Sequence, residues 1–450
     1  HLFIHGLCSS DIHIPYQVTI AVPVEYSMSF IGRAFLMETN QTLPNFRVAL
    51  SVEALNQNYS CSLDVFFGDV KVWSSGHLSP FYTTEKCVLE LTQDGDLQLK
   101  GQKEQVGWRS GTHGQGVERL NLLRTGNLVL VDALNLIKWQ SFNFPTNVML
   151  WGQKLDVATF LTSFPNNSTS FYSFEIQHNK IALYLNSGKL KYSYWEFKPT
   201  KNRNITFLEL ASRGLVLFND KHRKIAQIPS QRLEPQQFLA LSNKTGNLGL
   251  YYYSPNEAKF KSSFQALNTT CDLPMACKPY GICTLSHMCS CIRFVTNDKL
   301  KSDCGEGTPE TFCGNSQVEM VELQGVSSVL KVNPNKVNVS KDVCTSLCMD
   351  DCKCVAALYS SGKGDTDLQE CFLYELISGV KQVERGFGLT YMVKVAKGTS
   401  GGQKKSSGLK KWVLLVVGVV DGLIIFLVLV GVGYYVIRKR RKNSLDTDNT

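Results

Sequence analysis

The 450-residue sequence lacks the local patterns of a catalytic domain. It contains no Gly-rich phosphate loop, no H-R-D triplet and no D-F-G triplet. Residues 398–402 match the G-x-S-x-G pattern of serine hydrolases, but a Gly/Ser/Lys-rich segment follows where a nucleophile turn needs a helix. No carboxylate pair and no histidine cluster stands out. We therefore expect no enzymatic activity, no catalytic residue, no cofactor and no metal site.

An excess of charge of one sign is also missing from most of the chain. The formal net charge is +9, but residues 1–403 hold 38 basic and 35 acidic side chains. Residues 404–442 hold nine Lys/Arg and a single Asp. A nearly balanced surface offers no basic face to nucleic acid, so we expect no such partner. The basic end favours contact with anionic lipid.

Long apolar runs are absent apart from residues 412–437, which carry one charge, Asp421. About 20 apolar residues are enough for a helix to cross a bilayer. The basic run 438–442 follows directly, as on the cytoplasmic side of a membrane. The sequence therefore predicts a single-pass, type I plasma-membrane protein with a cytoplasmic tail at 438–450.

The cysteines and the glycosylation acceptors support this orientation. All fifteen cysteines precede the apolar run, and disulfides and N-x-[ST] acceptors both belong to the secretory side. The eight predicted acceptors also precede it: Asn40, Asn58, Asn166, Asn167, Asn204, Asn243, Asn268 and Asn338.

Two features of the predicted membrane helix suggest a partner. Gly418 and Gly422 form a G-x-x-x-G pattern, which lets two helices approach closely. Asp421 lies near mid-membrane, where a lone carboxylate is costly and usually has a partner. The alternative is that glycine is simply common in membrane helices and that a protonated Asp is tolerated there without a partner. The pattern favours self-association or association with a receptor kinase.

The first ten residues resemble the end of a signal peptide. The chain opens HLFIHGLCSS without a Met, and small residues follow the apolar ones. Cleavage near Cys8 would leave fourteen cysteines, an even number. We therefore expect residues 1–10 to stay outside the fold.

Cysteine is scarce between residues 11 and 265, where only Cys61 and Cys87 occur. Short runs of alternating apolar residues follow one another with turn residues between them, which predicts a mainly β structure. The pattern [DT]-G-[ND]-L-x-L recurs at 94–99, 125–130 and 245–250, which indicates an internal repeat.

The repeat resembles the bulb-type (G-type, mannose-binding) lectins, and residues 124–155 resemble the S-domain subfamily of plant receptors. The resemblance implies two threefold β-prisms, at 11–155 and 156–265. In that family each sugar strand reads Q-x-D-x-N-x-V-x-Y. This sequence keeps only part of the pattern in each repeat, so we expect its residues to hold strands and turns rather than a working mannose site. The candidate ligand residues are Asp94, Asp96, Asn127, Val129, Asn247 and Tyr251.

Two cysteine blocks follow. Residues 271–304 read C-x5-C-x5-C-x5-C-x-C-x12-C and resemble an EGF-like module (266–306). A zinc site is the rival interpretation, but the C-x2-C knuckle is absent. Residues 344–371 resemble a plant PAN/apple domain (307–396), where a helix carrying two cysteines is joined to a sheet.

Connectivity cannot be fixed by spacing alone. The resemblance implies Cys271–Cys283, Cys277–Cys289, Cys291–Cys304, Cys344–Cys371 and Cys348–Cys354. We pair the cysteines that remain as Cys313–Cys352 and Cys61–Cys87.

The expected architecture is thus mainly β: two lectin-like prisms, an EGF-like module, an α+β PAN/apple module, a stalk at 397–411 and one transmembrane helix. The sequence favours a non-catalytic cell-surface receptor-like protein that binds an extracellular glycan, peptide or protein and signals, if at all, through a partner kinase. A membrane-anchored mannose-type lectin is one alternative. A decoy or scaffold for S-domain receptor kinases is another.

Overall fold

The computed structural model describes most of the chain before residue 397. It divides into two units, residues 1–396 and 397–450, and only Gly433 of the second is described. No helix among the described residues is both long and apolar enough to cross a bilayer. The predicted stalk, membrane helix and tail, apart from Gly433, lie outside the described residues. The described residues are 2–23, 30–41, 44–55, 58–164, 170–200, 204–230, 237–292, 304, 318–362, 368–384, 388–396 and 433.

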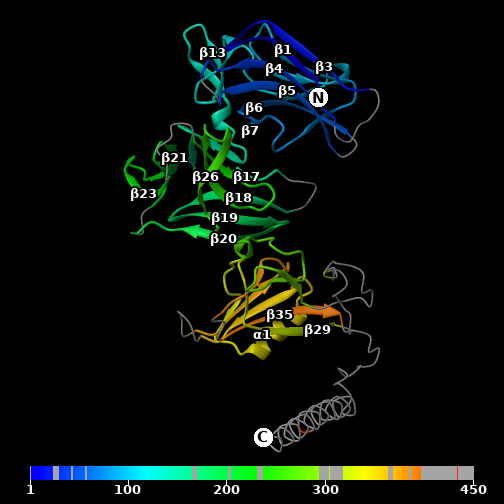
Figure 1. The fold of residues 1–450 in the computed structure, drawn as a ribbon, viewed down its shortest axis with the longest axis vertical. Coiled ribbons are helices and arrows are strands. Elements are labelled where there is room, and N and C mark those ends of the chain that lie inside the picture. The colour runs from blue at the N-terminus through cyan, green and yellow to red at the C-terminus, as the bar shows by residue number, and fades with distance from the viewer. Residues whose placement is uncertain are drawn as a thin grey trace, which may run out of the picture. The chain divides into compact units, whose positions relative to one another are not determined.

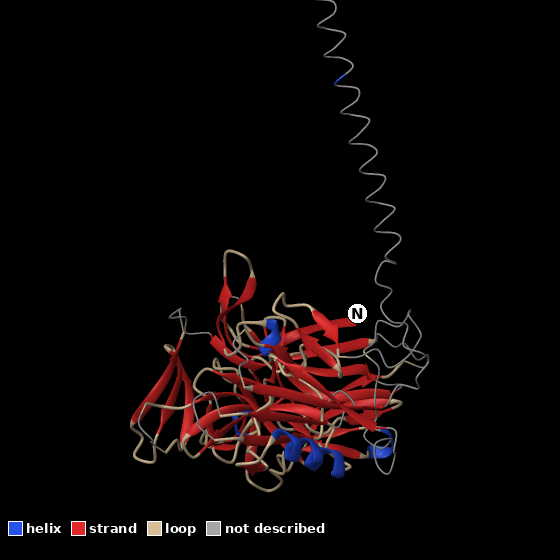
Figure 2. Ribbon diagram, turned by 90° about the horizontal axis from the view of Figure 1, so that it is seen from below, coloured by secondary structure: helices blue, strands red, loops and turns tan. Residues whose placement is uncertain are grey.

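The chain is mainly β, as expected, with strands making up most of the ribbon in Figure 2. The first part consists of three sheets around one apolar core (Figure 1). The six-stranded sheet contains β1 (Leu2–Ser9), β4 (Ile31–Glu38), β5 (Phe46–Leu55), β6 (Asn58–Phe67), β7 (Val70–Ser74) and β8 (Phe81–Thr83). The two four-stranded sheets run β11 (Val106–Arg109), β10 (Leu97–Lys100), β9 (Lys86–Leu91), β3 (Tyr16–Ala21) and β14 (Ile137–Gln140), β13 (Leu128–Asp132), β12 (Val117–Leu122), β2 (Asp11–His13).

The sequence predicts that residues 1–10 stay outside the fold, whereas the structure places residues 2–9 in a strand. Residues 2–9 form β1, which pairs in parallel with β4 through Leu2↔Gly32 and its neighbours. An apolar segment beside the free edge of a sheet can satisfy that edge's backbone groups by adding a strand, and this competes with its role as a leader.

Alternation along each strand determines which face is buried. On β5, Val48, Leu50 and Val52 are all 0% exposed and belong to the core. Arg47 and Glu53 lie on the opposite face and form ion pairs there. A shift of one residue in register would bury these charges, so the sequence specifies the register strongly.

Three tryptophans from three different sheets meet at one point. Trp73 comes from β7, Trp108 from β11 and Trp139 from β14. Their ring centroids lie 5.7–6.4 Å apart, and all three pairs meet edge to face. Aromatic rings favour this arrangement because the positive edge of one faces the negative face of another. The cluster therefore joins the last strands of all three sheets.

A second set of three four-stranded sheets follows, and most of its buried apolar residues belong to another core, whereas Val148, Leu150 and Phe238 pack in the first. The predicted range 11–155 includes β15 and β16, whose hydrogen bonds go to this second set. The sheets are β15 (Val148–Leu150), β24 (Gln237–Leu241), β25 (Leu248–Ser254), β26 (Lys259–Gln265); β16 (Lys154–Asp156), β21 (Phe207–Ala211), β22 (Gly214–Phe218), β23 (Lys224–Pro229); and β17 (Leu161–Thr162), β18 (Ser170–Gln177), β19 (Lys180–Ser187), β20 (Leu190–Phe197).

The two cysteine-rich segments, predicted as separate modules, share a sheet. Within it, β27 pairs in parallel with β34 at Cys283↔Lys381, and Lys381 Nζ lies 2.6 Å from Asp272 Oδ1. One sheet runs β28 (Cys289–Cys291), β27 (Gly281–Cys283), β34 (Val380–Gln382), β30 (Val326–Ser328). The other runs β29 (Val318–Gln324), β35 (Leu389–Ala396), β32 (Ala356–Ser360), β33 (Glu370–Tyr374), β31 (Lys336–Val337). Short 3-10 turns lie at Gln102–Glu104, Ser141–Asn143 and Thr270–Asp272.

The helix α1 (Lys341–Asp350) is joined to the five-stranded sheet by cysteines. The Val343 N–H donates to the Ser340 side chain at 3.4 Å, which caps the first turn. Cys344 and Cys348 are four residues apart, so both lie on one face of the helix, and both are fully buried.

The described disulfides are six of the seven pairs expected from the sequence. Cys352 is also disulfide-bonded, but its expected partner, Cys313, lies outside the described residues. The six are Cys61–Cys87, Cys271–Cys283, Cys277–Cys289, Cys291–Cys304, Cys344–Cys371 and Cys348–Cys354.

Removal of the Cys61–Cys87 bridge is predicted to destabilise the first part of the chain strongly. This bridge joins β6 to β9 across 26 residues, whereas Cys348–Cys354 spans six. Loop-closure entropy predicts losses of about 3.5 and about 2 kcal/mol for the respective double alanine variants. Hydrogen exchange of peptides from β6 and β9, compared with α1 in the control variant, measures both losses. A smaller loss at β6 and β9 than at α1 would contradict this ordering.

Candidate functional site

The repeated turns place a polar side chain in the same role three times. Each has a glycine with positive φ (80° at Gly95, 82° at Gly126, 72° at Gly246), which a residue with a Cβ rarely adopts. A Cβ at Gly126 would also lie 2.4 Å from the Phe46 ring. The residue after each glycine then turns inward.

The inward-pointing side chains of Asp96 and Asn127 bind the backbone segments that follow β11 and β14. One Asp96 oxygen accepts from the backbone N–H of Gly111 at 2.9 Å and of Thr112 at 3.0 Å. Asn127 Oδ1 accepts from the Phe142 N–H at 3.2 Å. Asp96 is only 2% exposed, and these bonds hold its pKa below the usual value although burial alone would raise it.

Asn247 has the same role in the second set of sheets. Its side chain accepts from the Leu267 N–H at 3.0 Å and donates to the Leu267 carbonyl at 2.8 Å. The polar atoms that a mannose site would need are therefore bonded within the fold at all three turns.

The other candidate ligand residues do not gather into one site. Asp94 is exposed and lies 3.7 Å from His113, Val129 is 1% exposed in the core, and Tyr251 stacks on Phe238.

Sequence reasoning missed a second threefold pattern, W-x-S. It occurs at 73–75, 108–110 and 139–141. In each case the serine hydroxyl accepts from a backbone N–H of the neighbouring middle strand, at 2.9–3.0 Å. The donors are Leu63, Leu97 and Leu128. A search for a recurring Trp with Ser two residues later would have revealed the threefold arrangement.

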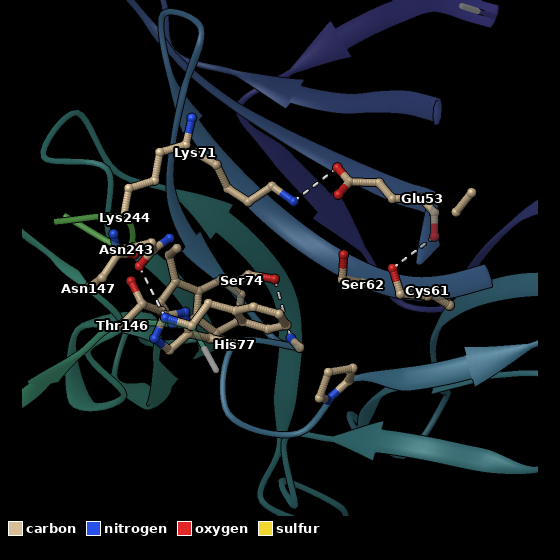
Figure 3. Close-up of a pocket in the computed structure, with 16 residues that line it drawn as sticks. Glu53, Cys61, Ser62, Lys71, Ser74, His77, Thr146, Asn147, Asn243 and Lys244 are labelled. Carbon is tan, nitrogen blue, oxygen red and sulfur yellow. Dashed lines mark hydrogen bonds and ion pairs between the residues drawn. The ribbon is translucent and has the colours of Figure 1, made fainter. Parts of the chain in front are cut away.

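A polar pocket lies beside this segment (Figure 3). It has a volume of about 390 Å³. His77, Thr146 and Asn243 lie on one side and Glu53 and Ser62 on the other. Glu53, Ser62 and His77 belong to the first set of sheets and Asn243 to the second, so the pocket depends on the packing of both.

The single lysine deep in this pocket is already neutralised. Lys71 Nζ lies 3.0 Å from Glu53 Oε1 and 2.9 Å from Asp64 Oδ2. Burial opposes charge on both partners, but the ion pairs outweigh it: the pKa of Lys71 is raised and that of Glu53 is lowered. The buried part of the pocket therefore offers hydroxyl and amide groups, and the exposed Lys244 contributes a positive charge to the lining.

His77 joins the two sets of sheets at the wall of the pocket. Its Nε2 lies 2.8 Å from the Thr162 carbonyl oxygen, and the ring is 7% exposed. Burial lowers the pKa of His77 and the nearby Lys71 adds to the effect, so the ring is neutral and donates to that carbonyl.

An aromatic groove of about 560 Å³ lies on the other side of the Trp73–His77 segment. Trp139 and Phe144 stack at 5.9 Å in its wall. Trp73 Nε1 donates to the Phe144 carbonyl at 2.9 Å, but among the described residues the indole N–H groups of Trp108 and Trp139 have no partner. The exposed side chains of Leu78, Phe144 and Phe160 add apolar surface to the groove.

Comparison with known proteins agrees with this architecture. A family model described as D-mannose binding lectin matches residues 71–171. A G-type lectin S-receptor-like serine/threonine-protein kinase of Arabidopsis thaliana is 25% identical over 83% of this chain and 46% of its own length. A PAN domain-containing protein of the same plant is 27% identical over 80% of this chain and 74% of its own.

The lectin family model and these relatives support the assignment of this chain to the S-domain receptor-like family. It spans about half of the length of the S-receptor-like kinases that it matches. A solved two-domain lectin from Scilla campanulata, described as a fetuin-binding protein, aligns with 51% of this S-domain chain and 98% of its own at 17% identity and a TM-score of 0.20.

Six of the predicted glycosylation acceptors are described, and all six are exposed; Asn166 and Asn167 lie outside the described residues. Only Asn243 among the six lines the polar pocket or the groove. The six are Asn40, Asn58, Asn204, Asn243, Asn268 and Asn338.

Asp96→Asn is predicted to keep the fold at neutral pH and to reduce its sensitivity to acid. An amide oxygen can accept the same backbone bonds, as Asn127 does, so we expect a change within about 1 kcal/mol at pH 7. The pKa of Asp96 is lower in the folded chain than in the unfolded chain. Its contribution to folding stability is therefore fully present above about pH 3.9 and is lost as the pH falls through the folded pKa.

Denaturant unfolding between pH 6 and pH 3 measures this effect. The wild type should lose more stability on acidification than Asp96→Asn. Asp94→Asn is the matched control, because it removes an exposed carboxylate from the same turn and should keep the wild-type acid slope. Equal slopes for the wild type and Asp96→Asn would contradict the role given to Asp96.

Proposed function

We propose that the chain is a non-catalytic, cell-surface receptor-like protein whose lectin-like part binds a saccharide-bearing extracellular ligand in the aromatic groove. The observation that carries this proposal is the cluster of aromatic faces with two unpartnered indole donors. Membership of the S-domain family supports the receptor-like role.

The chemistry of the groove favours a sugar. The C–H face of a sugar ring packs well on Trp and Phe, and its hydroxyls accept hydrogen bonds from indole N–H groups. Arg109 lines the groove, and no Asp or Glu is among the described lining residues. A neutral saccharide fits this lining, and one carrying a carboxylate gains from Arg109.

The lectin-type turns are the weaker candidate for ligand binding. A mannose hydroxyl would have to displace bonds that Asp96, Asn127 and Asn247 make to buried backbone groups. Leaving such groups unpaired costs about 1–3 kcal/mol each. The mannose-type lectin is therefore less favoured than recognition in the groove.

The position in the cell and the route of the signal form the rest of the proposal. We place residues 1–396 outside the cell on the basis of the acceptor and cysteine distribution, with 412–437 as the membrane anchor. In the bilayer, Gly418, Asp421 and Gly422 would contact a receptor kinase or a second copy of the chain. A partner kinase would then carry the signal.

Substitutions at the rim of the groove are predicted to weaken ligand binding. Full-length protein in detergent is applied to an array of neutral and uronic oligosaccharides. Phe160→Ser and Leu78→Ser should weaken binding at least tenfold, because each removes exposed apolar contact surface. Arg109→Gln should weaken only acid-bearing ligands.

Leu134→Ser is the matched control. Leu134 is 77% exposed but lies outside the groove, so this variant should bind like the wild type. Binding that survives both rim variants, or that is lost in Asp94→Ala, would move recognition away from the groove.

A further inference from the structure

Asn243 is an acceptor asparagine in the wall of the polar pocket (Figure 3). It lies in the turn between β24 and β25, where Ser242 N–H donates to the Asn247 carbonyl at 2.9 Å and Gly246 N–H donates to the Ser242 carbonyl at 3.0 Å. Asn243 and Thr245 of the N-x-T pattern are both exposed. The pattern is therefore held in one geometry and is open to modification.

The orientation of the Asn243 amide is fixed by one hydrogen bond. The Phe164 N–H donates to Asn243 Oδ1 at 3.0 Å, and only the amide oxygen can accept such a bond. An N-linked sugar is attached to Nδ2, so this bond persists after glycosylation. Because the carboxamide is planar, holding Oδ1 also fixes the direction in which the sugar leaves the side chain.

The lining of the pocket suits the core N-acetylglucosamine of such a glycan. Ser62 Oγ lies in the lining and has no hydrogen-bond partner among the described residues. Trp73 and Phe164 supply apolar surface. The charge of Lys71 is neutralised by Glu53 and Asp64, so the buried part of the pocket suits neutral hydroxyl and acetamide groups, with Lys244 exposed in the lining.

We infer that the N-glycan of Asn243 folds back onto the chain, with its core N-acetylglucosamine seated in the polar pocket between the two sets of sheets. The inference rests on the extracellular location proposed above but not on the ligand of the groove. Trp73, His77 and Thr146 line both cavities, so the seated sugar also supports one wall of the groove. The other described acceptors line neither cavity, so we expect their glycans to extend into solvent.

Native endoglycosidase digestion tests this inference. The full chain is produced in glycosylating cells with kifunensine, so that every glycan is high-mannose, and is digested with endoglycosidase H. Mass spectrometry of glycopeptides follows each site over time. Release at Asn243 should be at least tenfold slower than at Asn204 and Asn338, and denaturation should make the three rates equal. Equal rates in the native protein would overturn the inference.

Variants that fill the pocket test whether the Asn243 glycan is protected from endoglycosidase H by its position in the pocket. Ser60 lines the pocket and donates to the Glu53 carbonyl, so Ser60→Tyr should displace the sugar and raise the Asn243 rate to that of the other sites. Because Ser60→Tyr also removes the Asn58 acceptor, it is compared with Asn58→Gln, which removes the same acceptor without filling the pocket and should keep the protection. Ser262→Tyr is the matched control: Ser262 is exposed on β26, also donates to a backbone carbonyl and lies outside the pocket, so protection should persist. Protection that survives Ser60→Tyr would place the sugar elsewhere and overturn the inference.

The pattern of occupancy separates this inference from the proposed function. Glycans at Asn204 and Asn338 with none at Asn243 would overturn the seated glycan alone. A chain without any N-glycan would overturn the extracellular location and the inference with it.

Discussion

The hydrogen bond from a middle-strand N–H to the serine of each W-x-S triplet is the constraint on which the first part of the fold depends. A buried backbone N–H must have a partner, and Ser75, Ser110 and Ser141 supply one at the point where each outer strand ends. Each serine lies two residues after a tryptophan of the central cluster. The same contact that satisfies the backbone therefore also fixes where the three indole rings meet.

This constraint assigns different roles to the polar and aromatic residues. Asp96 and Asn127 use their polar atoms to bind the backbone that follows β11 and β14. The turns are therefore rigid, and these atoms are not available to a ligand. The aromatic rings line the groove, and among the described residues the indole N–H groups of Trp108 and Trp139 have no hydrogen-bond partner. The segment from Trp73 to His77 separates this groove from the polar pocket, so both cavities depend on the same backbone.

Local patterns predicted much of this arrangement. The glycine turns and the strand alternation correspond to short stretches of sequence. Of the six described disulfides, five were implied by the family resemblance, and Cys61–Cys87 was paired from the cysteines that remained. The W-x-S triplets escaped notice because they lie 35 and 31 residues apart without a shared flanking pattern. The pairing of β27 with β34 and the pocket formed by Lys71 and Asn243 join residues far apart in the chain, for which a single sequence carries no local signal. The composition of residues 1–10 resembles the end of a signal peptide, so the sequence did not predict the strand β1.

The central claim is that the lectin-type turns serve the fold and not mannose, and calorimetric titration of the full chain with methyl α-D-mannoside tests it most directly. The account predicts no saturable binding below millimolar sugar, a binding free energy weaker than about −4 kcal/mol. Micromolar binding that Asp94→Ala or Asn247→Ala abolishes, with the fold retained, would contradict it.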